Sequence, residues 1–400
     1  MIASFTPSVL RGKIDAPPSK SMAHRYLIGA ALSGEKCTLN GVDFSDDILA
    51  SIDCLRALGA TVTADGSTVT VDPKGFMQSE NPTLLCRESG STLRFFIPLA
   101  LCLNKSVTFV GSDRLFERPL DVYEALAREN GFTFKMDKSS LTVSGSLKSG
   151  SYKIRGDISS QFITGLIFGL LFLGRKSDIE IIPPFESRSY IDLTISALRS
   201  FGANVRFLDE YRIEILPTEL HAYSGRIEGD FSNAAFLDAF NYLGSQVDVN
   251  NLSSDSLQGD RVYREYFDAI SSGTPTLDIS DCPDLGPVLF VLAALKNGAT
   301  FIGTDRLKAK ESDRGAATDE ELKKLGGGLI FGENVIIVPK QTLKYNGKPL
   351  CAHNDHRIVM AMSVILSVLG GELHGIEAVK KSYPSFFEDL RSLGAKVELL

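Results

Sequence analysis

The feature that most constrains the fold is a pattern that recurs six times along the chain. Each time, a polar helix-start signal precedes an apolar stretch, and the successive steps are 70, 70, 73, 52 and 71 residues. Self-similarity at a nearly fixed period indicates a repeat architecture, in which one supersecondary unit is used several times. The six predicted helix starts are Ser19, Ser89, Ser159, Ser232, Asp284 and Asp355.

A second marker has the same period. Later in each repeat an amphipathic segment ends in a glycine, the residue expected just past a helix end. Runs of β-branched residues, such as 106–110, 179–182 and 299–302, lie between the markers. Each repeat therefore reads as helix, strand, helix, strand, turn and strand, which predicts an α/β protein. The glycines are Gly59, Gly131, Gly202, Gly273, Gly326 and Gly394.

The six repeats fall into two similar halves. Residues 111–115 (GSDRL) recur as residues 303–307 (GTDRL), which pairs repeats one to three with repeats four to six. The sixth repeat stops after its first strand, whereas the chain opens with a strand-like run that belongs to no repeat. We therefore predict a first domain of residues 17–227 and a second of residues 1–16 plus 228–400. The short step of 52 indicates that the fourth repeat has lost about one pair of strands.

Composition excludes several classes of protein. The net charge of −7 and the pI near 5.4 argue against a nucleic-acid or membrane-surface binder. The six cysteines are scattered, which is typical of reduced thiols and not of a disulfide scaffold or a CxxC site. The longest apolar run, residues 162–173, is too short to span a bilayer. No secretory signal precedes it, so we expect a soluble cytoplasmic protein.

Several predicted helix starts carry basic or polar side chains. Unpaired N–H groups and the helix dipole make such starts attractive to phosphate and carboxylate groups. In the first repeat Lys20 and Arg25 could bind an anion, and in the second Gly90 would allow its close approach. An ordinary helix cap with a solvated lysine, or a plain glycine turn, would give the same local sequence.

The third repeat offers hydroxyl and amide groups suited to a sugar-like or phosphorylated ligand. Ser159, Ser160 and Gln161 open its first helix, and Ser187 and Tyr190 precede its second. Simple N-capping remains the alternative at both places.

Residues 310–314 (KESDR) form the densest charged motif. If they start the helix that runs to Leu325, Lys310 and Arg314 lie four residues apart on one face, with Glu311 beside them. A salt-bridged surface helix is the alternative. Asp284, at another predicted helix start, would be either a structural counter-charge or a base for a hydroxyl group.

The last repeat adds further candidates. Asp355 is a natural helix cap before Arg357, and Lys381 supplies one more cation. His353 and His356 suggest zinc, but no third ligand has a suitable spacing, so no metal site is predicted.

Together, and in order from about Pro17 to Phe386, these motifs resemble the 5-enolpyruvylshikimate-3-phosphate synthase family. The resemblance implies an inside-out α/β barrel fold: two domains, each of three βαβαββ repeats, that close over an interdomain cleft holding the active site. It also implies a reaction without metal or cofactor. The 5-hydroxyl of shikimate 3-phosphate adds to C2 of phosphoenolpyruvate, C3 is protonated, and phosphate leaves the tetrahedral intermediate. A monomer with these two small-molecule substrates is expected.

The resemblance also assigns residues by motif match. The implied catalytic residues are Asp284, which would accept the hydroxyl proton, Glu311 and Lys310, which would deliver a proton to C3, and Lys20. The implied phosphoenolpyruvate contacts are Lys20, Gly90, Arg118 in the sequence 117–119 (ERP), Gln161, Arg314, Arg357 and Lys381. The implied shikimate 3-phosphate contacts are Lys20, Ser21, Arg25, Ser159, Ser160, Gln161, Ser187, Tyr190, Asp284 and Lys310.

The chain departs from the family pattern in three ways. Glu88 stands where many relatives carry asparagine, Arg306 stands where some do, and the fourth repeat is short. The nearest alternative is the sister transferase that acts on UDP-N-acetylglucosamine. That family usually has a reactive cysteine in the loop where residues 112–119 contain none. A non-catalytic anion-binding protein and an RNA-end-processing enzyme of similar repeats are further alternatives. The acidic net charge and the presence of both Asp284 and Glu311 weigh against them.

Overall fold

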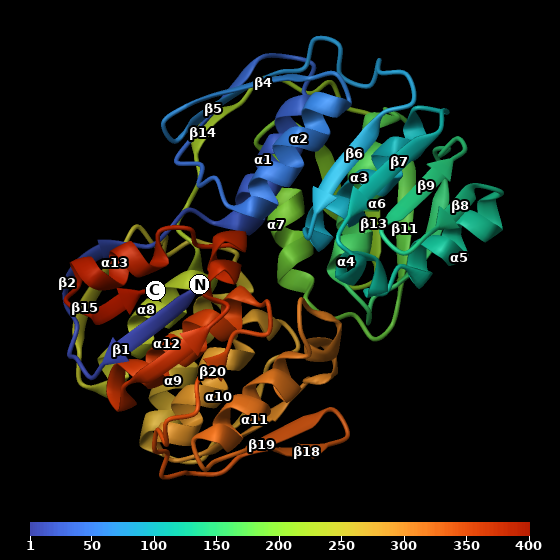
Figure 1. Ribbon diagram of the computed structural model, residues 1–400. Coiled ribbons are helices and arrows are strands. Elements are labelled where there is room, and N and C mark those ends of the chain that lie inside the picture. Colours follow the sequence, from blue (N-terminus) through green and yellow to red (C-terminus); the bar gives the residue numbers. More distant parts are fainter. The chain divides into compact units, whose positions relative to one another are not determined.

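The computed structural model describes residues 1–400, which form two compact halves (Figure 1). The first half is Pro18–Glu228, and the second half is Met1–Pro17 together with Gly229–Leu400. The chain thus crosses between the halves after Pro17 and after Glu228. Each crossing lies one residue later than the boundary expected from the sequence. Each half has its own hydrophobic core.

The first half contains three mixed four-stranded sheets, in the orders β14-β3-β5-β4, β6-β7-β9-β8 and β10-β11-β13-β12. In each, one parallel pair is followed by two antiparallel pairs. Helices α3 and α6 connect the parallel pairs β6–β7 and β10–β11, and in each sheet a hairpin joins the last antiparallel pair, β4–β5, β8–β9 or β12–β13. The elements are α1 (Lys20–Leu32), β3 (Cys37–Asn40), α2 (Asp46–Ala57), β4 (Thr61–Asp65), β5 (Thr68–Asp72), β6 (Thr83–Arg87), α3 (Gly90–Cys102), β7 (Val107–Gly111), α4 (Asp113–Glu117), α5 (Asp121–Asn130), β8 (Thr133–Met136), β9 (Ser140–Ser144), β10 (Ser151–Arg155), α6 (Ser160–Phe172), β11 (Ser177–Ile182), α7 (Arg188–Arg199), β12 (Asn204–Phe207), β13 (Arg212–Leu216) and β14 (Ser224–Arg226).

The second half contains two sheets of the same kind, β16-β17-β19-β18 and β20-β21-β1-β22, and one two-stranded sheet, β15-β2. The amino-terminal strand β1 pairs with β21 and β22 of the last repeat. None of the six sheets closes into a barrel. The elements are β1 (Ile2–Thr6), β2 (Arg11–Asp15), α8 (Phe231–Ala239), η1 (Asn241–Leu243), β15 (Gln246–Asn250), η2 (Gly259–Val262), α9 (Tyr263–Ser272), β16 (Thr276–Asp278), η3 (Pro283–Leu285), α10 (Gly286–Leu295), β17 (Ala299–Ile302), η4 (Asp305–Ala309), α11 (Arg314–Lys324), β18 (Ile330–Gly332), β19 (Val335–Val338), β20 (Leu350–Cys351), α12 (His356–Leu369), β21 (Gly371–His374), η5 (Ile376–Lys381), α13 (Phe386–Ser392) and β22 (Lys396–Leu399).

The fourth repeat lacks the antiparallel strand pair present in the other five, as its short sequence step predicts. Gln246 N–H donates to Leu10 on the β2 side, so the backbone groups of the next residue, Val247, point to the open side of β15. There the side-chain amide of Asn241 accepts from Val247 N–H at 2.6 Å and donates to its carbonyl at 2.7 Å. Asn241 thus replaces two of the hydrogen bonds that the missing strand would make.

The first helix of a repeat is buried around most of its circumference. In α6 nearly every residue is apolar, and eleven of its thirteen residues are buried, as expected of a helix that is hydrophobic on all sides. Gly165 and Gly169 let α6 approach α3 closely, because a Cβ at Gly169 would lie 2.9 Å from the Cβ of Pro98. The polar starts of α3 and α6 are therefore held as neighbours.

The predicted helix-ending glycines behave as expected at five of six places. Gly59, Gly131, Gly202, Gly326 and Gly394 have positive φ angles, which glycine adopts without strain. At Gly273 the φ angle is −176°, which is extended backbone, so this glycine ends α9 without a left-handed turn. No helix in the structure is long and apolar enough to cross a membrane.

Candidate functional site

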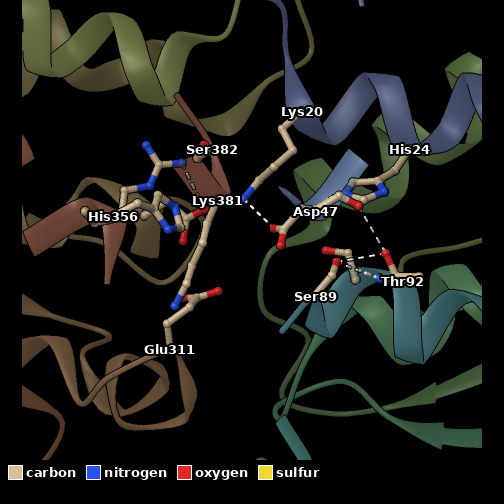
Figure 2. A network of polar contacts seen from close by, with 12 residues as sticks. Lys20, His24, Asp47, Ser89, Thr92, Glu311, His356, Lys381 and Ser382 are labelled. Atoms are coloured by element: carbon tan, nitrogen blue, oxygen red, sulfur yellow. Dashed lines mark hydrogen bonds and ion pairs between the residues drawn. The ribbon is translucent and has the colours of Figure 1, made fainter. Parts of the chain in front are cut away.

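Lys20 begins α1 and is held in place by an acid from α2. Its ammonium group donates to Oδ2 of Asp47 at 2.8 Å (Figure 2). The Ser19 hydroxyl caps the helix by accepting from Met22 N–H. Sequence reasoning did not single out Asp47. The adjacent acids Asp46 and Asp47 after Ser45 do mark a helix start, but nothing local connects them with Lys20.

A buried chain of hydroxyl groups lies behind the start of α3. Thr92 donates to the cap residue Ser89 at 2.8 Å, Ser51 lies 2.9 Å from Thr92, and Nδ1 of His24 lies 2.8 Å from Ser51 (Figure 2). Burial, and then the charges of Lys20 and Arg25, hold the pKa of His24 well below its usual range. His24 is therefore neutral at physiological pH, and this network adds no charge to the site.

Gly90 allows close approach, but the group beside it belongs to the protein. A Cβ at this position would lie 2.6 Å from Nη1 and 2.8 Å from Cζ of Arg118. Arg118 is almost fully buried and directly follows α4, so it does not lie at a helix start. The absence of a side chain at Gly90 thus makes room for the Arg118 guanidinium group.

Gln161 links the starts of α3 and α6. Its Oε1 accepts from Arg94 at 2.8 Å, and its Nε2 donates to the Ser91 hydroxyl at 2.8 Å. Ser159 caps α6 by accepting from Gln161 N–H, and Ser160 is buried in its first turn. The predicted group of Ser159, Ser160 and Gln161 is therefore assembled at one helix start.

Arg25 is buried in the first half and connects α1 with α7. Its guanidinium group donates to Thr194 Oγ1 and to the backbone carbonyls of Ser21 and Tyr190, at 2.7–2.9 Å. Burial lowers the pKa of Arg25 to about 10. Tyr190 lies inside the first turn of α7 and not before it, which corrects the sequence-based placement, while Ser187 is the residue before α7 and has a φ of 54°.

Asp284 is the centre of the polar cluster in the second half. Its carboxylate accepts from Lys310 at 3.0 Å and from Arg314 at 2.6 Å, and Arg357 lies 3.5 Å away. Burial by itself would raise the pKa of Asp284, but these three cations hold it well below its usual range. Burial lowers the pKa of Lys310, with Asp284 opposing this effect and Arg314 and Arg306 adding to it.

Arg314 organises this cluster and is 1% exposed. Besides Asp284, its guanidinium group donates to Glu311 at 2.8 Å and to Asp355 at 2.9 Å. Asp313, not Lys310, caps α11, and Lys310 has extended backbone after η4. The prediction that Lys310 and Arg314 lie four apart on one helix face is therefore wrong. They meet because both reach Asp284.

Arg357 lies in the first turn of α12. Asp355 caps this helix by accepting from Arg357 N–H at 2.8 Å, and the Arg357 side chain donates to Asn233 at 3.2 Å. Ser232 is not the start of α8, as the sequence suggested, because Asp230 is the cap and accepts from Asn233 N–H. Asn233 was not predicted, because a distant residue supplies its partner.

Lys381 ends η5, so it does not lie at a helix start either. Its ammonium group donates to the Asn354 carbonyl at 2.6 Å. Asn354 and the preceding His353 both have positive φ angles, and Nε2 of His353 lies 2.6 Å from the buried carboxylate of Glu321. A strained two-residue turn, fastened by Glu321, thus presents the carbonyl that holds Lys381 (labelled in Figure 2).

One group of side chains has the composition of a metal site. Ligand atoms of Glu320, Glu321 and His353 lie within 4.8 Å of one another. Both oxygens of Glu321 already accept from Lys324, at 2.9 and 3.0 Å, and one of them also contacts His353. A lysine ammonium group thus occupies the position where a metal cation would be expected. His356 is not part of this group.

Comparison with known proteins identifies the family to which this chain belongs. The fold and the two polar clusters define an α/β protein of six related repeats with cations and carboxylates gathered near helix starts. The sequence profile of the EPSP synthase (3-phosphoshikimate 1-carboxyvinyltransferase) family matches residues 5–390, and the chain belongs to that family. The family resemblance and the α/β fold predicted from sequence are confirmed.

Individual relatives agree with this assignment. The chain is 40% identical to the 3-phosphoshikimate 1-carboxyvinyltransferase of Clostridium kluyveri, covering 99% of this chain and 98% of that protein. It is 39% identical to the protein of that name from Clostridium novyi, covering 98% and 97%. The structure of EPSP synthase from Acinetobacter baumannii superposes with a TM-score of 0.79 at 21% identity over 99% of both chains, which shows the shared fold.

The comparison also bears on the short repeat. The alignment with the Clostridium kluyveri protein spans 420 positions, at least 20 more than the 400 residues of this chain. That difference is of the size of a strand pair with its connections, the element that the fourth repeat lacks.

Proposed function

We propose that this protein transfers the carboxyvinyl group of phosphoenolpyruvate to the 5-hydroxyl of shikimate 3-phosphate and releases phosphate, a step of aromatic amino acid biosynthesis. The observation that carries the proposal is the family match over residues 5–390, together with a carboxylate, Asp284, surrounded by three cations. Both substrates are anions, so they need cations for binding, whereas their reacting atoms need proton transfer.

We assign the residues of both halves to the two substrates. Cations suit the phosphate and carboxylate of phosphoenolpyruvate, and hydroxyl and amide groups suit the ring and phosphate of shikimate 3-phosphate. The proposed phosphoenolpyruvate contacts are Lys20, Gly90, Arg118, Gln161, Arg314, Arg357 and Lys381. The proposed shikimate 3-phosphate contacts are Lys20, Ser21, Arg25, Ser159, Ser160, Gln161, Ser187, Tyr190, Asp284 and Lys310.

The structure adds a condition to this assignment for Arg314. Its guanidinium group already contacts three carboxylates in a fully buried position. These contacts use three of the five guanidinium N–H donors, so a contact with phosphoenolpyruvate would use one of the other two and would need this buried group to become accessible. The ammonium group of Lys20 donates to Asp47 with one of its three N–H groups, so it can bind an anion without breaking that contact.

In the proposed mechanism Asp284 accepts the proton of the attacking hydroxyl group. The cationic neighbours of Asp284 keep it ionised, and they also make it a weak base. Anionic substrates would draw part of the charge of Lys310 and Arg357 to themselves. The pKa of Asp284 would then rise, and the carboxylate would become a better proton acceptor when both substrates are bound.

The second proton transfer involves Lys310 and Glu311. Burial lowers the pKa of Lys310, which makes its proton easier to release, and Glu311 contacts Arg314 beside it. In the addition step the 5-oxygen bonds to C2 while C3 gains a proton. In the elimination step C3 loses a proton and the C2–O bond to phosphate breaks, which restores the double bond. No covalent bond to the enzyme is required.

We further propose that the protein acts as a cytoplasmic monomer. All six cysteines are free thiols, which suits a reducing compartment.

The deciding experiment measures phosphate release from phosphoenolpyruvate with each of two acceptors. We expect release with shikimate 3-phosphate and none with UDP-N-acetylglucosamine. Release with the sugar nucleotide alone would show that the acceptor assignment is wrong, and release with neither would refute the transferase function itself.

A further inference from the structure

Asp260 is a buried acid that the proposed mechanism does not use. It lies in η2 and is 2% exposed. The Ser232 hydroxyl makes a short hydrogen bond to its Oδ2, whereas its Oδ1 is buried and has no hydrogen-bond partner. A buried carboxylate with one unsatisfied oxygen is costly, while a protonated carboxyl group in the same place is much less so. The geometry therefore favours a proton on Asp260.

The position of Asp260 is fixed by contacts that do not involve the cluster around Asp284. The neighbouring side chain of Gln258 accepts from Phe231 N–H at 3.0 Å and donates to the Gly229 carbonyl at 2.8 Å. These two bonds fasten η2 to the start of α8 and hold Asp260 against Ser232. The contact between Ser232 and Asp260 is therefore held in place by the backbone around it.

Asp260 is nevertheless connected with the cluster. Ser232 precedes Asn233, which accepts from Arg357, and Arg357 in turn approaches Asp284. A change in the Ser232–Asp260 pair is therefore two contacts away from the carboxylate to which we assign proton transfer.

The polar groups that face Asp260 come from three elements, η3, α8 and α12, and from the residues just before η3 and α8. Burial raises the pKa of Asp260 to about 7, and the carboxylates of Asp284 in η3 and Asp230 at the start of α8 act in the same direction. The Ser232 hydroxyl and the Arg357 guanidinium group on α12 oppose them. The thiol of Cys282, before η3, also faces this acid, and burial raises its pKa well above the usual range, so it stays neutral.

The two protonation states of Asp260 have different consequences for Ser232. When Asp260 is ionised, Ser232 must donate its hydrogen to it. When Asp260 carries a proton on Oδ2, it donates to Ser232, whose own hydrogen is then available to another acceptor. Ionisation also adds a negative charge near Asp284 and Arg357.

We propose that Asp260 is a proton-holding positioning residue of this cluster. By gaining or losing one proton it reverses the Ser232 hydrogen bond and changes the charge beside Asp284 and Arg357, and so it sets how strongly the cluster binds an anion. The identity of that anion as part of a substrate rests on the proposed function, but the switch itself does not.

The test uses Asp260→Asn, which keeps the shape of the side chain and cannot ionise. The probe is sulfate, which remains a dianion at every pH used, so its own titration does not interfere. Binding to the full-length protein is measured by calorimetry near about pH 6 and about pH 8.5, on either side of the pKa of about 7 of Asp260. We expect the wild-type affinity to fall by about fivefold or more between the two, because a new negative charge opposes the anion. The affinity of the variant for sulfate should fall much less over the same change of pH.

Asp255→Asn is the matched control, because it removes an acid from the exposed segment just before η2. It should retain the wild-type pH dependence. An equal loss of sulfate affinity in wild type and Asp260→Asn overturns the proposal. If the variant does not fold, infrared difference spectra of the wild type decide. The C=O stretch of a buried protonated carboxyl group must be present near about pH 6 and lost near about pH 8.5, and its absence at the lower pH also overturns the proposal.

Failure of this inference and failure of the proposed function are separable. The function is judged by phosphate release from wild-type protein with the two acceptors, whereas the inference is judged by sulfate binding without any substrate.

Discussion

The ammonium group of Lys20 and the carboxylate of Asp47 form an ion pair of 2.8 Å in which the side chains are only 15% and 11% exposed. The two residues begin α1 and α2. Because little solvent reaches the pair, the contact restricts Lys20 more than a surface ion pair would. Asp47 thus sets the position from which Lys20 can reach an anion.

This relationship predicts the effect of Asp47→Asn. The variant leaves Lys20 without its ionic partner, so kcat/KM for phosphoenolpyruvate should fall by about tenfold or more, because misplaced binding groups lose transition-state stabilisation. Steady-state kinetics measure the effect. Asp46→Asn removes the same charge one residue earlier, at a half-exposed acid 3.6 Å from Arg87, and should stay close to wild type. Equal losses in both variants would mean that overall charge and not the contact matters.

A second prediction concerns Asp284→Asn. This change removes the proposed proton acceptor from among Lys310, Arg314 and Arg357, and kcat/KM should fall by at least about 100-fold. Circular dichroism must show that the variant is folded, because three buried cations lose their shared partner. Asp281→Asn, an exposed acid three residues earlier, is the control. Near-native turnover in Asp284→Asn would remove this residue from the mechanism.

A third prediction follows from the contact between Gly90 and Arg118. The Cβ added by Gly90→Ala would overlap the guanidinium group, which must then move, so KM for phosphoenolpyruvate should rise by about tenfold. The backbone at Gly90 does not require glycine, so thermal stability should change little. In the Arg118→Lys background, where the head group is slimmer, Gly90→Ala should raise KM by a smaller factor than it does in wild type. A double variant with fully additive losses would argue against the steric cause.

The sequence was sufficient for the features that are local or periodic. Ser19, Ser89, Ser159 and Asp355 were predicted as helix starts, and each one caps a helix because its side chain can accept from a nearby backbone N–H. The short fourth repeat was visible as a changed step. These predictions succeed because the interactions that produce them lie within a few residues.

The features that failed or were missed depend on distant partners. The motif 310–314 predicts a helix that includes Lys310, but the ammonium group of Lys310 binds Asp284, 26 residues earlier, and α11 starts only after Asp313. Asp47, Asn233 and Asp260 carry no motif of their own. Their relevance appears only when Lys20, Arg357 and Ser232 are brought beside them, which tertiary packing decides.

A fourth prediction concerns pH. The hydrogen bond with Glu321 raises the pKa of His353 in the folded protein. A raised pKa means that the folded state holds this proton more tightly than the unfolded state. The resulting stability is complete below the unfolded pKa of about 6.5 and is lost as the pH rises through the folded value. Urea unfolding of wild type should therefore lose free energy across this window, and His353→Gln should lose less. Parallel curves for the two proteins would contradict the prediction.

The last prediction concerns the open edge of β15. Asn241 satisfies both backbone groups of Val247 where the other repeats have a strand, and Asn241→Ala would leave them without these partners. Unsatisfied groups in a partly buried place cost about 1–3 kcal/mol, so the free energy of unfolding in urea should fall by roughly this amount. An open strand edge also favours pairing between copies, and sedimentation at rising concentration should detect more self-association in the variant.

Ser245→Ala serves as the control. It also removes a hydrogen bond to the backbone, the one from Leu10 N–H, but it leaves the Val247 edge covered by Asn241. A variant as stable and as monodisperse as wild type would show that water covers this edge as well as Asn241 does.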